Sequence, residues 1–111
     1  MLNIIADNYI VFLLVFIRMT GLVSFNPENR KVFQNGKPVP LSPKATRLLE
    51  LFLLNKNRVL SKNVIEEKLY SWNEEVSSNT VEVHIHTIRR KLGNALIKTV
   101  HGTGYTLGDT V

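Results

Sequence analysis

The sequence predicts an α+β domain: a small N-terminal antiparallel sheet, then three helices, then a C-terminal β-hairpin. Short alternating segments divided by Asn, Pro and Gly turns fill residues 22–41. From Ser42 the apolar residues instead recur every three or four positions. After Gly93 the alternation returns on both sides of a glycine-containing turn. The chain has 111 residues, which suits one domain rather than two.

The composition points to an anionic partner and excludes thiol chemistry. Lys and Arg number 14 against nine Asp and Glu, which gives a formal net charge of +5. A small basic domain suits nucleic acid first and a membrane surface second. Cys is absent, so disulfides, thiolate metal sites and a Cys nucleophile are excluded. The lack of Cys fits a reducing compartment, and we expect a cytoplasmic protein.

The N-terminal segment contains an apolar run, IVFLLVFI (Ile10–Ile17). A transmembrane helix needs about 20 apolar residues, and Asn3 and Asp7 interrupt any upstream extension. A signal peptide would need a cationic start and a small-residue cleavage site, which this segment lacks. We therefore expect a buried strand or an ill-ordered leader, and no membrane anchor. Residues 1–18 are assigned as an apolar leader or remnant, and residues 19–111 as the domain.

The small sheet is predicted from three short strands and two turns. The strands are Leu22–Phe25, Lys31–Phe33 and the PVPL segment after Lys37. A turn at Asn26–Asn29 joins the first two, because Pro and Asn favour turn geometry. Asn35-Gly36 is a strong hairpin signal, since both residues tolerate positive φ. The prolines of PVPL cannot donate to a ladder, so this segment is expected at the edge.

Two helices follow, each with a serine cap. Ser42 caps the first, which begins at Pro43 and ends near residues 55–57. Its apolar stripe is Ala45, Leu48, Leu49, Phe52 and Leu53. Ser61 caps the second, whose apolar residues are Val64, Ile65 and Leu69, with Leu60 and Ile65 at the positions of a hydrophobic staple. The polar segment Tyr70–Ser78 is a predicted loop, in which Trp72 is expected to cover the core.

The third helix is predicted at residues 78–92, although VEVHIH at its start also alternates like a strand. The spacing of Val81, Ile85, Ile88 and Leu92 is i, i+4, i+7, i+11, which only a helix places on one side. Ser77, Ser78 and Asn79 offer alternative N-caps. Gly93 suits the position after the helix, and three cations in the last turn complement its dipole.

The opposite face of this helix carries the candidate DNA-contacting residues. At 100° per residue it presents Asn79, Val83, His86, Thr87 and Arg90, flanked by Glu82 and Arg89 on one side and by His84 and Lys91 on the other. In the major groove of DNA, Arg can donate two hydrogen bonds to guanine, Asn and Thr can form hydrogen bonds with base edges, and Val can contact the thymine methyl group. This face of the helix therefore suits the major groove. An ordinary solvent-facing side explains the helix alone equally well. A metal site is excluded, because a helix points two His residues two apart in different directions.

The C-terminal hairpin favours DNA binding over an ordinary solvent-facing side as the interpretation of this helix. Residues 97–107 are predicted as two strands around the turn HGTG (His101–Gly104). Helix, loop, cationic helix and hairpin in this order describe a winged helix-turn-helix, in which the hairpin is the wing. The wing residues are His101, Gly102, Thr103, Gly104 and Tyr105. A phosphate-binding glycine loop would need a helix after it, which the remaining residues do not predict.

From about Met19 to Leu107 the chain resembles the C-terminal effector domain of OmpR/PhoB-class response regulators, most of all the PmrA/QseB-like members. The motifs that carry the resemblance are LSPKATRLLELFLLN, RVLSKNVIEEKLY, SSNTVEVHIHTIRRKLG and IKTVHGTGYTL. The resemblance implies double-stranded DNA as partner, head-to-tail homodimers on direct-repeat half-sites, and transcription regulation within a two-component phosphorelay. It also implies contact with RNA polymerase through the loop 70–78, and we name Trp72, Asn73, Glu74 and Glu75 for that contact.

Site residues are then assigned as follows. The predicted base-facing residues are Asn79, Glu82, Val83, His86, Thr87 and Arg90, of which the first five match family positions that contact bases or backbone. The predicted DNA-backbone residues are Thr80, Arg89, Lys91 and Thr99, of which Thr80, Arg89 and Thr99 match family positions used on phosphates. No catalytic, metal or cofactor site and no small-molecule substrate is predicted. The three His residues lack obvious catalytic partners, so an enzyme is not expected.

Two departures from the family pattern affect the expected function. The family commonly has Arg before GTGY, and here His101 stands there, so we expect a weaker and pH-sensitive minor-groove contact. Family members also carry a receiver domain of about 120 residues, which residues 1–18 cannot hold. Asp7 has no acidic partners nearby, so no phosphorylation site is assigned. The alternative function is a protein-interaction module that uses loop 70–78, with vestigial DNA binding.

Overall fold

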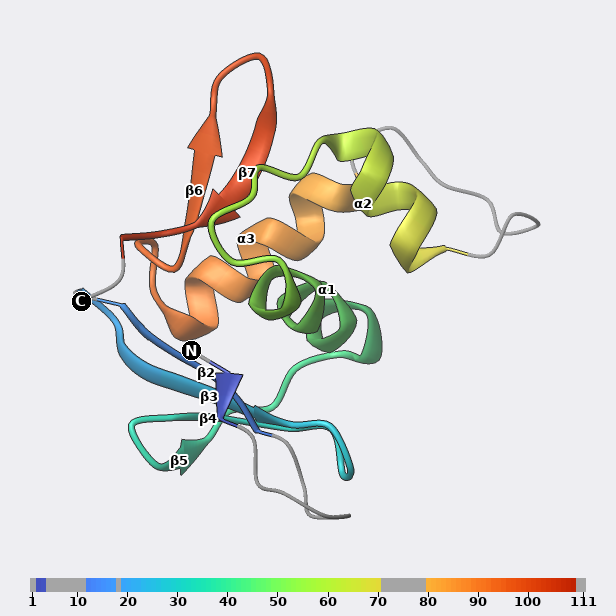
Figure 1. Cartoon of the computed structure of the whole chain (residues 1–111). Coiled ribbons are helices and arrows are strands. Elements are labelled where there is room, and N and C mark those ends of the chain that lie inside the picture. Colours follow the sequence, from blue (N-terminus) through green and yellow to red (C-terminus); the bar gives the residue numbers. More distant parts are fainter. Residues whose placement is uncertain (1, 4–11, 18, 71–79, 110–111) are drawn as a thin grey trace.

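A computed structural model describes residues 2–3, 12–17, 19–70 and 80–109. The elements are β1 (Leu2–Asn3), β2 (Phe12–Ile17), β3 (Gly21–Asn26), β4 (Lys31–Gln34), β5 (Lys37–Pro38), α1 (Pro43–Leu54), α2 (Lys62–Leu69), α3 (Thr80–Leu92), β6 (Ile97–Val100) and β7 (Gly104–Leu107). The sheet lies below α1 in Figure 1, and the β6–β7 hairpin rises on the other side of the helices. The predicted α+β winged helix-turn-helix is confirmed.

The N-terminal sheet is antiparallel, with the strands in sequence order from β1 to β5. Of the apolar run predicted as a strand or a leader, the residues Phe12–Ile17 form β2, which pairs with β3 from Leu13↔Phe25 to Ile17↔Gly21. Leu13, Val15 and Ile17 face the core, whereas Phe16 is exposed. The predicted domain start at Met19 therefore falls between two paired strands, and the sheet includes part of the expected leader. That the segment 1–18 is a remnant stays a prediction.

The turn between β4 and β5 forms as the Asn35-Gly36 signal predicts. Both residues have positive φ, 51° and 84°, which is the geometry that a two-residue hairpin requires. The Asn35 side chain also accepts a hydrogen bond from the Leu22 backbone N–H at 3.0 Å, tying the turn to β3. The short β5 lies at the edge of the sheet, where its proline is tolerated.

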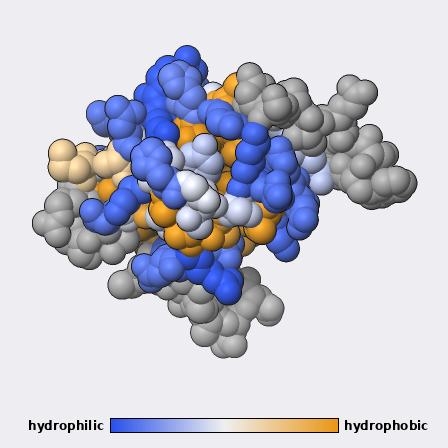
Figure 2. Space-filling model, turned by 90° about the horizontal axis from the view of Figure 1, so that it is seen from above, coloured by the Kyte–Doolittle hydropathy of each residue, from blue (hydrophilic) through white to orange (hydrophobic). Residues whose placement is uncertain are grey.

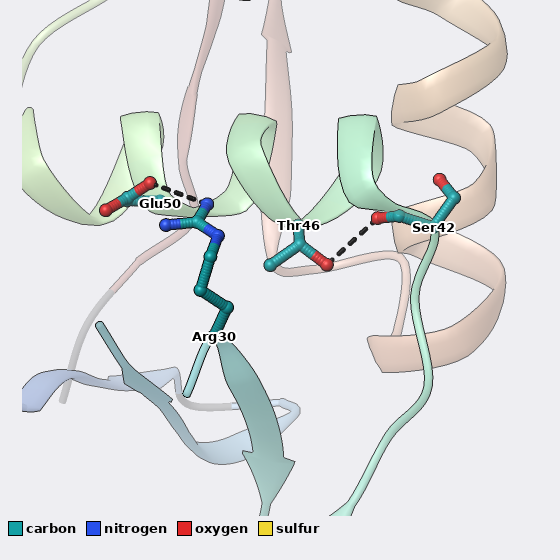
Figure 3. A network of polar contacts seen from close by, with 4 residues as sticks. All are labelled: Arg30, Ser42, Thr46 and Glu50. Carbon is teal, nitrogen blue, oxygen red and sulfur yellow. Dashed lines mark hydrogen bonds and ion pairs between the residues drawn. The ribbon is translucent and has the colours of Figure 1, made fainter. Parts of the chain in front are cut away.

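The helix α1 covers the inner face of the sheet. Ser42 accepts a hydrogen bond from the Ala45 N–H at its start, as predicted, and the five residues of its apolar stripe are buried. Figure 3 shows two polar contacts on its flank: the Arg30 guanidinium meets Glu50 at 3.0 Å, and the Thr46 hydroxyl donates to the Ser42 carbonyl at 2.9 Å. The first contact fixes the turn between β3 and β4 against α1.

The helix α2 is short and capped by Ser61, which accepts from the Val64 N–H at 3.2 Å. Leu60 and Ile65 are both buried, as expected of a hydrophobic staple. Val64, the third apolar residue of this helix, is 37% exposed. The buried residues of this eight-residue helix are Ile65 and Leu69, and Val64 lies beside that packed side rather than on it. The expected role of Trp72 as a core lid lies outside the described residues.

The helix α3 completes the core. Its predicted stripe of Val81, Ile85, Ile88 and Leu92 is buried, and the alternating VEVHIH segment is helical from Thr80 on. The three candidate N-caps, residues 77–79, lie outside the described residues, and so does the start of the predicted helix at residues 78 and 79. The helix ends at Leu92, and Gly93 follows it with φ of 112°, as predicted. The Gln34 amide donates to the Leu92 and Thr20 carbonyls at 2.7 and 2.8 Å, joining the end of α3 to the sheet.

Candidate nucleic-acid interface

The outward face of α3 is the centre of the candidate interface. Glu82, Val83, His86, Arg90 and Lys91 are exposed on it, and Thr80, Thr87 and Arg89 are half-buried. Val83 is 52% exposed, although it is aliphatic. The helix therefore has an apolar side in the core and a polar, mainly cationic side directed outward, as the spacing predicts. Asn79, a predicted base-facing residue, lies outside the described residues.

The Thr87 hydroxyl has its proton engaged within the helix. It donates to the Val83 carbonyl one turn earlier at 3.1 Å, a common arrangement of Thr in helices. The oxygen keeps lone pairs that can accept. Towards a ligand, the Thr87 hydroxyl in this arrangement can therefore act as an acceptor.

Glu82 is paired with a cation on a neighbouring helix. Its carboxylate lies 3.3 Å from the Lys62 Nζ at the start of α2, and both side chains are well exposed. Exposed pairs of this kind contribute about 0–1 kcal/mol. Glu82 can therefore exchange this partner for an amino group on a base at little cost.

His84 is turned toward α2, away from the outward face. Its Nε2 lies 3.0 Å from the Tyr70 hydroxyl, and the Lys44 Nζ lies 4.4 Å from the centre of the Tyr70 ring. Burial, and then the charge of Lys44, lower the pKa of His84 below its usual value. The sequence predicts no partner for this histidine, because Lys44 and Tyr70 belong to other elements.

Two of the predicted DNA-backbone residues, Arg89 and Lys91, donate hydrogen bonds to the protein itself, and a third, Thr99, accepts one. The Lys91 ammonium donates to the Pro40 carbonyl at 2.8 Å, between β5 and α1. The Arg89 guanidinium donates to the Ile97 carbonyl and to the Thr99 hydroxyl, both on β6. Neither contact was anticipated from the sequence, and both side chains lie at the C-terminal half of α3.

The wing, defined as β6, β7 and the turn between them, stands beside α3 (Figure 1). His101, Gly102 and Thr103 are exposed at its tip, and Gly104 and Tyr105 are half-buried. Tyr105 exchanges two backbone hydrogen bonds with Leu60, at 2.7 and 2.9 Å. The Thr106 hydroxyl donates to the Arg58 carbonyl at 2.8 Å. These contacts fix β7 against the linker that precedes α2.

Two shallow depressions adjoin these elements. One, at the end of α3, is lined by His86, Arg89, Arg90, Gly93 and Asn94. The other, at the wing tip, is lined by Lys62 and residues 99–105. Viewed from the side on which the wing and α2 stand, the described surface is mostly hydrophilic, with smaller apolar areas between the polar side chains (Figure 2). Both depressions are open to solvent and are lined in part by basic side chains.

The described residues form neither a metal centre nor a membrane-spanning helix. Within the described residues, no group of three or more His, Asp or Glu side chains is placed to hold a metal ion. No helix there is long and apolar enough to cross a bilayer. The four loop residues named for polymerase contact, Trp72 to Glu75, lie outside the described ranges.

Comparison with known proteins gives a consistent result. The sequence profile of the family described as "Transcriptional regulatory protein, C terminal" matches residues 36–107. The transcriptional regulatory protein QseB of Escherichia coli O157:H7 is 55% identical over 89 residues, which are 80% of this chain and 41% of QseB. The response regulator protein PmrA of Pseudomonas aeruginosa is 47% identical over 85 residues, 77% of this chain and 38% of PmrA.

The fold comparison agrees. The crystal structure of the Klebsiella pneumoniae RstA DNA-binding domain in complex with the RstA box superposes with a TM-score of 0.69 at 26% identity, over 78% of this chain and 90% of that one. The chain spans about two-fifths of the length of the curated relatives that it matches.

Proposed function

Because this chain belongs to the family of transcriptional regulatory protein C-terminal domains, we propose that it binds double-stranded DNA sequence-specifically and regulates transcription. The match over residues 36–107 and the identity to QseB and PmrA support the family. What QseB, PmrA and RstA do is a property of those proteins. The proposal for this chain rests on its own residues as well.

The two-sided α3 is the observation that carries the proposal. Four aliphatic side chains hold it in the core, and the other side presents Val83, His86 and Arg90 to solvent. An α-helix fits the major groove of B-DNA, where Arg forks to guanine and an aliphatic carbon touches the thymine methyl. We propose α3, extended to residue 78, as the recognition helix, with Asn79, Glu82 and Thr87 completing the base-facing set.

The wing supplies the second contact. His101 and Thr103 are exposed at its tip beside Lys62. A hairpin held next to a recognition helix reaches the neighbouring minor groove or the backbone. Phosphate neutralisation by exposed cations around α3, such as Lys62 at the start of α2, would supply most of the affinity, and α3 most of the specificity.

The setting in a regulatory system extends the proposal. The two relatives named above are a transcriptional regulatory protein and a response regulator protein, of which this chain covers 41% and 38%. We propose an effector domain of a two-component response regulator, which binds direct-repeat half-sites as a head-to-tail dimer. The segment 70–78 is proposed to contact RNA polymerase, and the site of action is the cytoplasm.

Selection of bound duplexes from a random pool, repeated at two salt concentrations, tests the function. We expect a recovered sequence motif, repeated in tandem, and an affinity that falls steeply with salt because counterions are released from the phosphates. Recovery of no motif from a folded protein would contradict sequence-specific binding. If duplex affinity is also weak at low salt, the protein-interaction alternative through residues 70–78 becomes the better explanation.

A further inference from the structure

Arg89 is adjacent in sequence to the exposed Arg90 but is placed differently. Its Nε and Nη2 donate to the Ile97 carbonyl at 3.1 and 2.8 Å, and Nη2 also meets the Thr99 hydroxyl at 2.9 Å. The guanidinium therefore donates hydrogen bonds to two acceptors on β6, which lie eight and ten residues further along the chain. Hydrogen bonds from a charged donor are about twice as strong as neutral ones.

The strand that accepts hydrogen bonds from Arg89 is β6, the outer strand of the wing. β7 lies between β6 and Leu60, because it pairs with β6 on one side and bridges Leu60 on the other. The linker 58–60 therefore supports β7 directly. Arg89 supplies the corresponding support to β6 from α3, so that the wing is held from two sides.

Arg89 also contacts the second strand of the wing. Its guanidinium carbon lies 6.0 Å from the centre of the Tyr105 ring, at the distance limit of a cation–π contact. Tyr105 is the cross-strand partner of Thr99. One side chain of α3 thus touches both strands on a single face of the hairpin, and that face is fixed relative to the helix.

We propose that Arg89 is a positioning residue, which sets the wing at a fixed angle to α3 so that both enter neighbouring grooves of one duplex together. This inference rests on the proposed function and assigns Arg89 a role other than the phosphate contact expected from the sequence. The Nε and Nη2 donors are taken by Ile97 and Thr99, so a two-pronged contact with a phosphate would break the bond to Thr99, and only Nη1 keeps N–H groups for a single phosphate contact. The main effect of Arg89 on DNA binding is therefore assigned to the wing.

Salt dependence distinguishes the two roles of Arg89. A side chain that neutralises a phosphate contributes about 0.9 to the slope of log affinity against log salt concentration. A positioning residue lowers affinity without removing a phosphate contact. We expect Arg89→Ala to lose about tenfold or more in affinity for the selected duplex, with the slope unchanged. Arg90→Ala is the matched control on the same helix, and it reports the loss of an exposed cation.

Two further variants distinguish the planar hydrogen-bonding geometry of Arg89 from its positive charge. Arg89→Lys keeps the charge but not the planar fork, so we expect it to bind nearly as poorly as Arg89→Ala. Thr99→Val removes one acceptor while keeping a β-branched side chain on β6. In a double-mutant cycle, Arg89→Ala combined with Thr99→Val should lose less affinity than the sum of the two single losses. These variants keep the test valid if Arg89→Ala unfolds, which thermal unfolding of each protein would reveal.

Groove-specific footprinting shows directly which contact is lost. Hydroxyl-radical cleavage reports the minor-groove side of the backbone, and methylation of guanine N7 reports the major groove. With Arg89→Ala we expect the wing footprint to fade while the α3 footprint remains. A slope lower by about 0.9 with the wing footprint intact would overturn the inference and leave the proposed function standing. A wild-type protein without any motif or footprint would instead overturn the proposed function.

Discussion

The Tyr70 hydroxyl and the His84 Nε2 lie 3.0 Å apart and join the end of α2 to the side of α3. The Lys44 ammonium lies over the same Tyr70 ring and donates to the Leu69 carbonyl at 2.8 Å. Side chains from α1, α3 and the end of α2 thus meet at one point, directly before the segment 71–79. The arrangement links the stability of the helical part to the protonation of one histidine.

Stability should fall in mild acid because of His84. Burial and the charge of Lys44 lower its pKa in the folded protein, so the unfolded chain binds a proton more readily. In that case the free energy of unfolding rises with pH through the interval between the two pKa values. The His84 contribution is complete above about pH 6.5, the usual histidine value, and is lost as the pH falls toward the lowered one. Urea unfolding at pH 7.5 and 5.5 measures this difference.

His84→Gln should reduce that difference between the two pH values, since glutamine does not titrate. His86→Gln removes an exposed histidine from the same helix and serves as the control. An equal pH dependence in wild type and His84→Gln would contradict the assignment of the acid effect to His84.

Truncating a side chain should reduce stability strongly on the buried face of α3 and hardly at all on its exposed face. Ile85 is buried in the core, so Ile85→Ala is expected to cost about 2–5 kcal/mol of unfolding free energy. Val83 lies two residues away and is 52% exposed, so Val83→Ala should change stability by less than about 0.5 kcal/mol. Chemical denaturation measures both. Affinity for the selected duplex should fall with Val83→Ala despite its unchanged stability.

If Arg90 and Thr87 contact bases, their replacement should reduce affinity for the selected duplex more than for a random one. Arg90→Ala or Thr87→Ala is expected to cost about 1–3 kcal/mol on the selected duplex and to relax the preference at one base position. Lys98→Ala, on the wing strand β6, is the comparison, since an exposed cation there would act on all sequences alike. Binding is measured on the selected and on a random duplex. Equal losses on both duplexes for Arg90→Ala and Thr87→Ala would refute base reading by these residues.

Most of the fold follows from local signals in the sequence. The buried stripe of α3 was predictable because only helical spacing brings Val81, Ile85, Ile88 and Leu92 together. The Ser42 and Ser61 caps and the Asn35-Gly36 turn act within three residues of themselves. Signals of this range need no knowledge of the tertiary structure, and they were read correctly.

Contacts between distant segments were not predictable in the same way. Arg89 was assigned to phosphate because the sequence does not show that Ile97 and Thr99 return to its side. Gln34 reaches Leu92 across 58 positions, and no pattern marks it as a link. His84 was grouped with the cationic flank, although it faces Tyr70. For Arg89 and Lys91, a charge pattern identified the exposed region of the helix but not the acceptors that orient each side chain.

The wing provides a test that compares two glycines. A Cβ on Gly104 would lie 2.1 Å from the Leu60 carbonyl oxygen and 2.7 Å from its carbon, both backbone atoms that cannot rotate away. Gly104→Ala should therefore separate β7 from the linker and cost about 1–3 kcal/mol of stability. Because the tip then moves relative to α3, affinity for the selected duplex should fall as well.

Gly102→Ala is the matched control at the tip of the same hairpin. A Cβ there meets nothing within 4 Å, although φ is 73°, so the cost is limited to the backbone strain of about 1–2 kcal/mol. The variants thus differ in the clash with Leu60. Hydrogen exchange of the Leu60 and Tyr105 amides, which bond each other's carbonyls, should accelerate in Gly104→Ala and stay near wild type in Gly102→Ala. Equal protection in all three proteins would show that the linker does not position the wing.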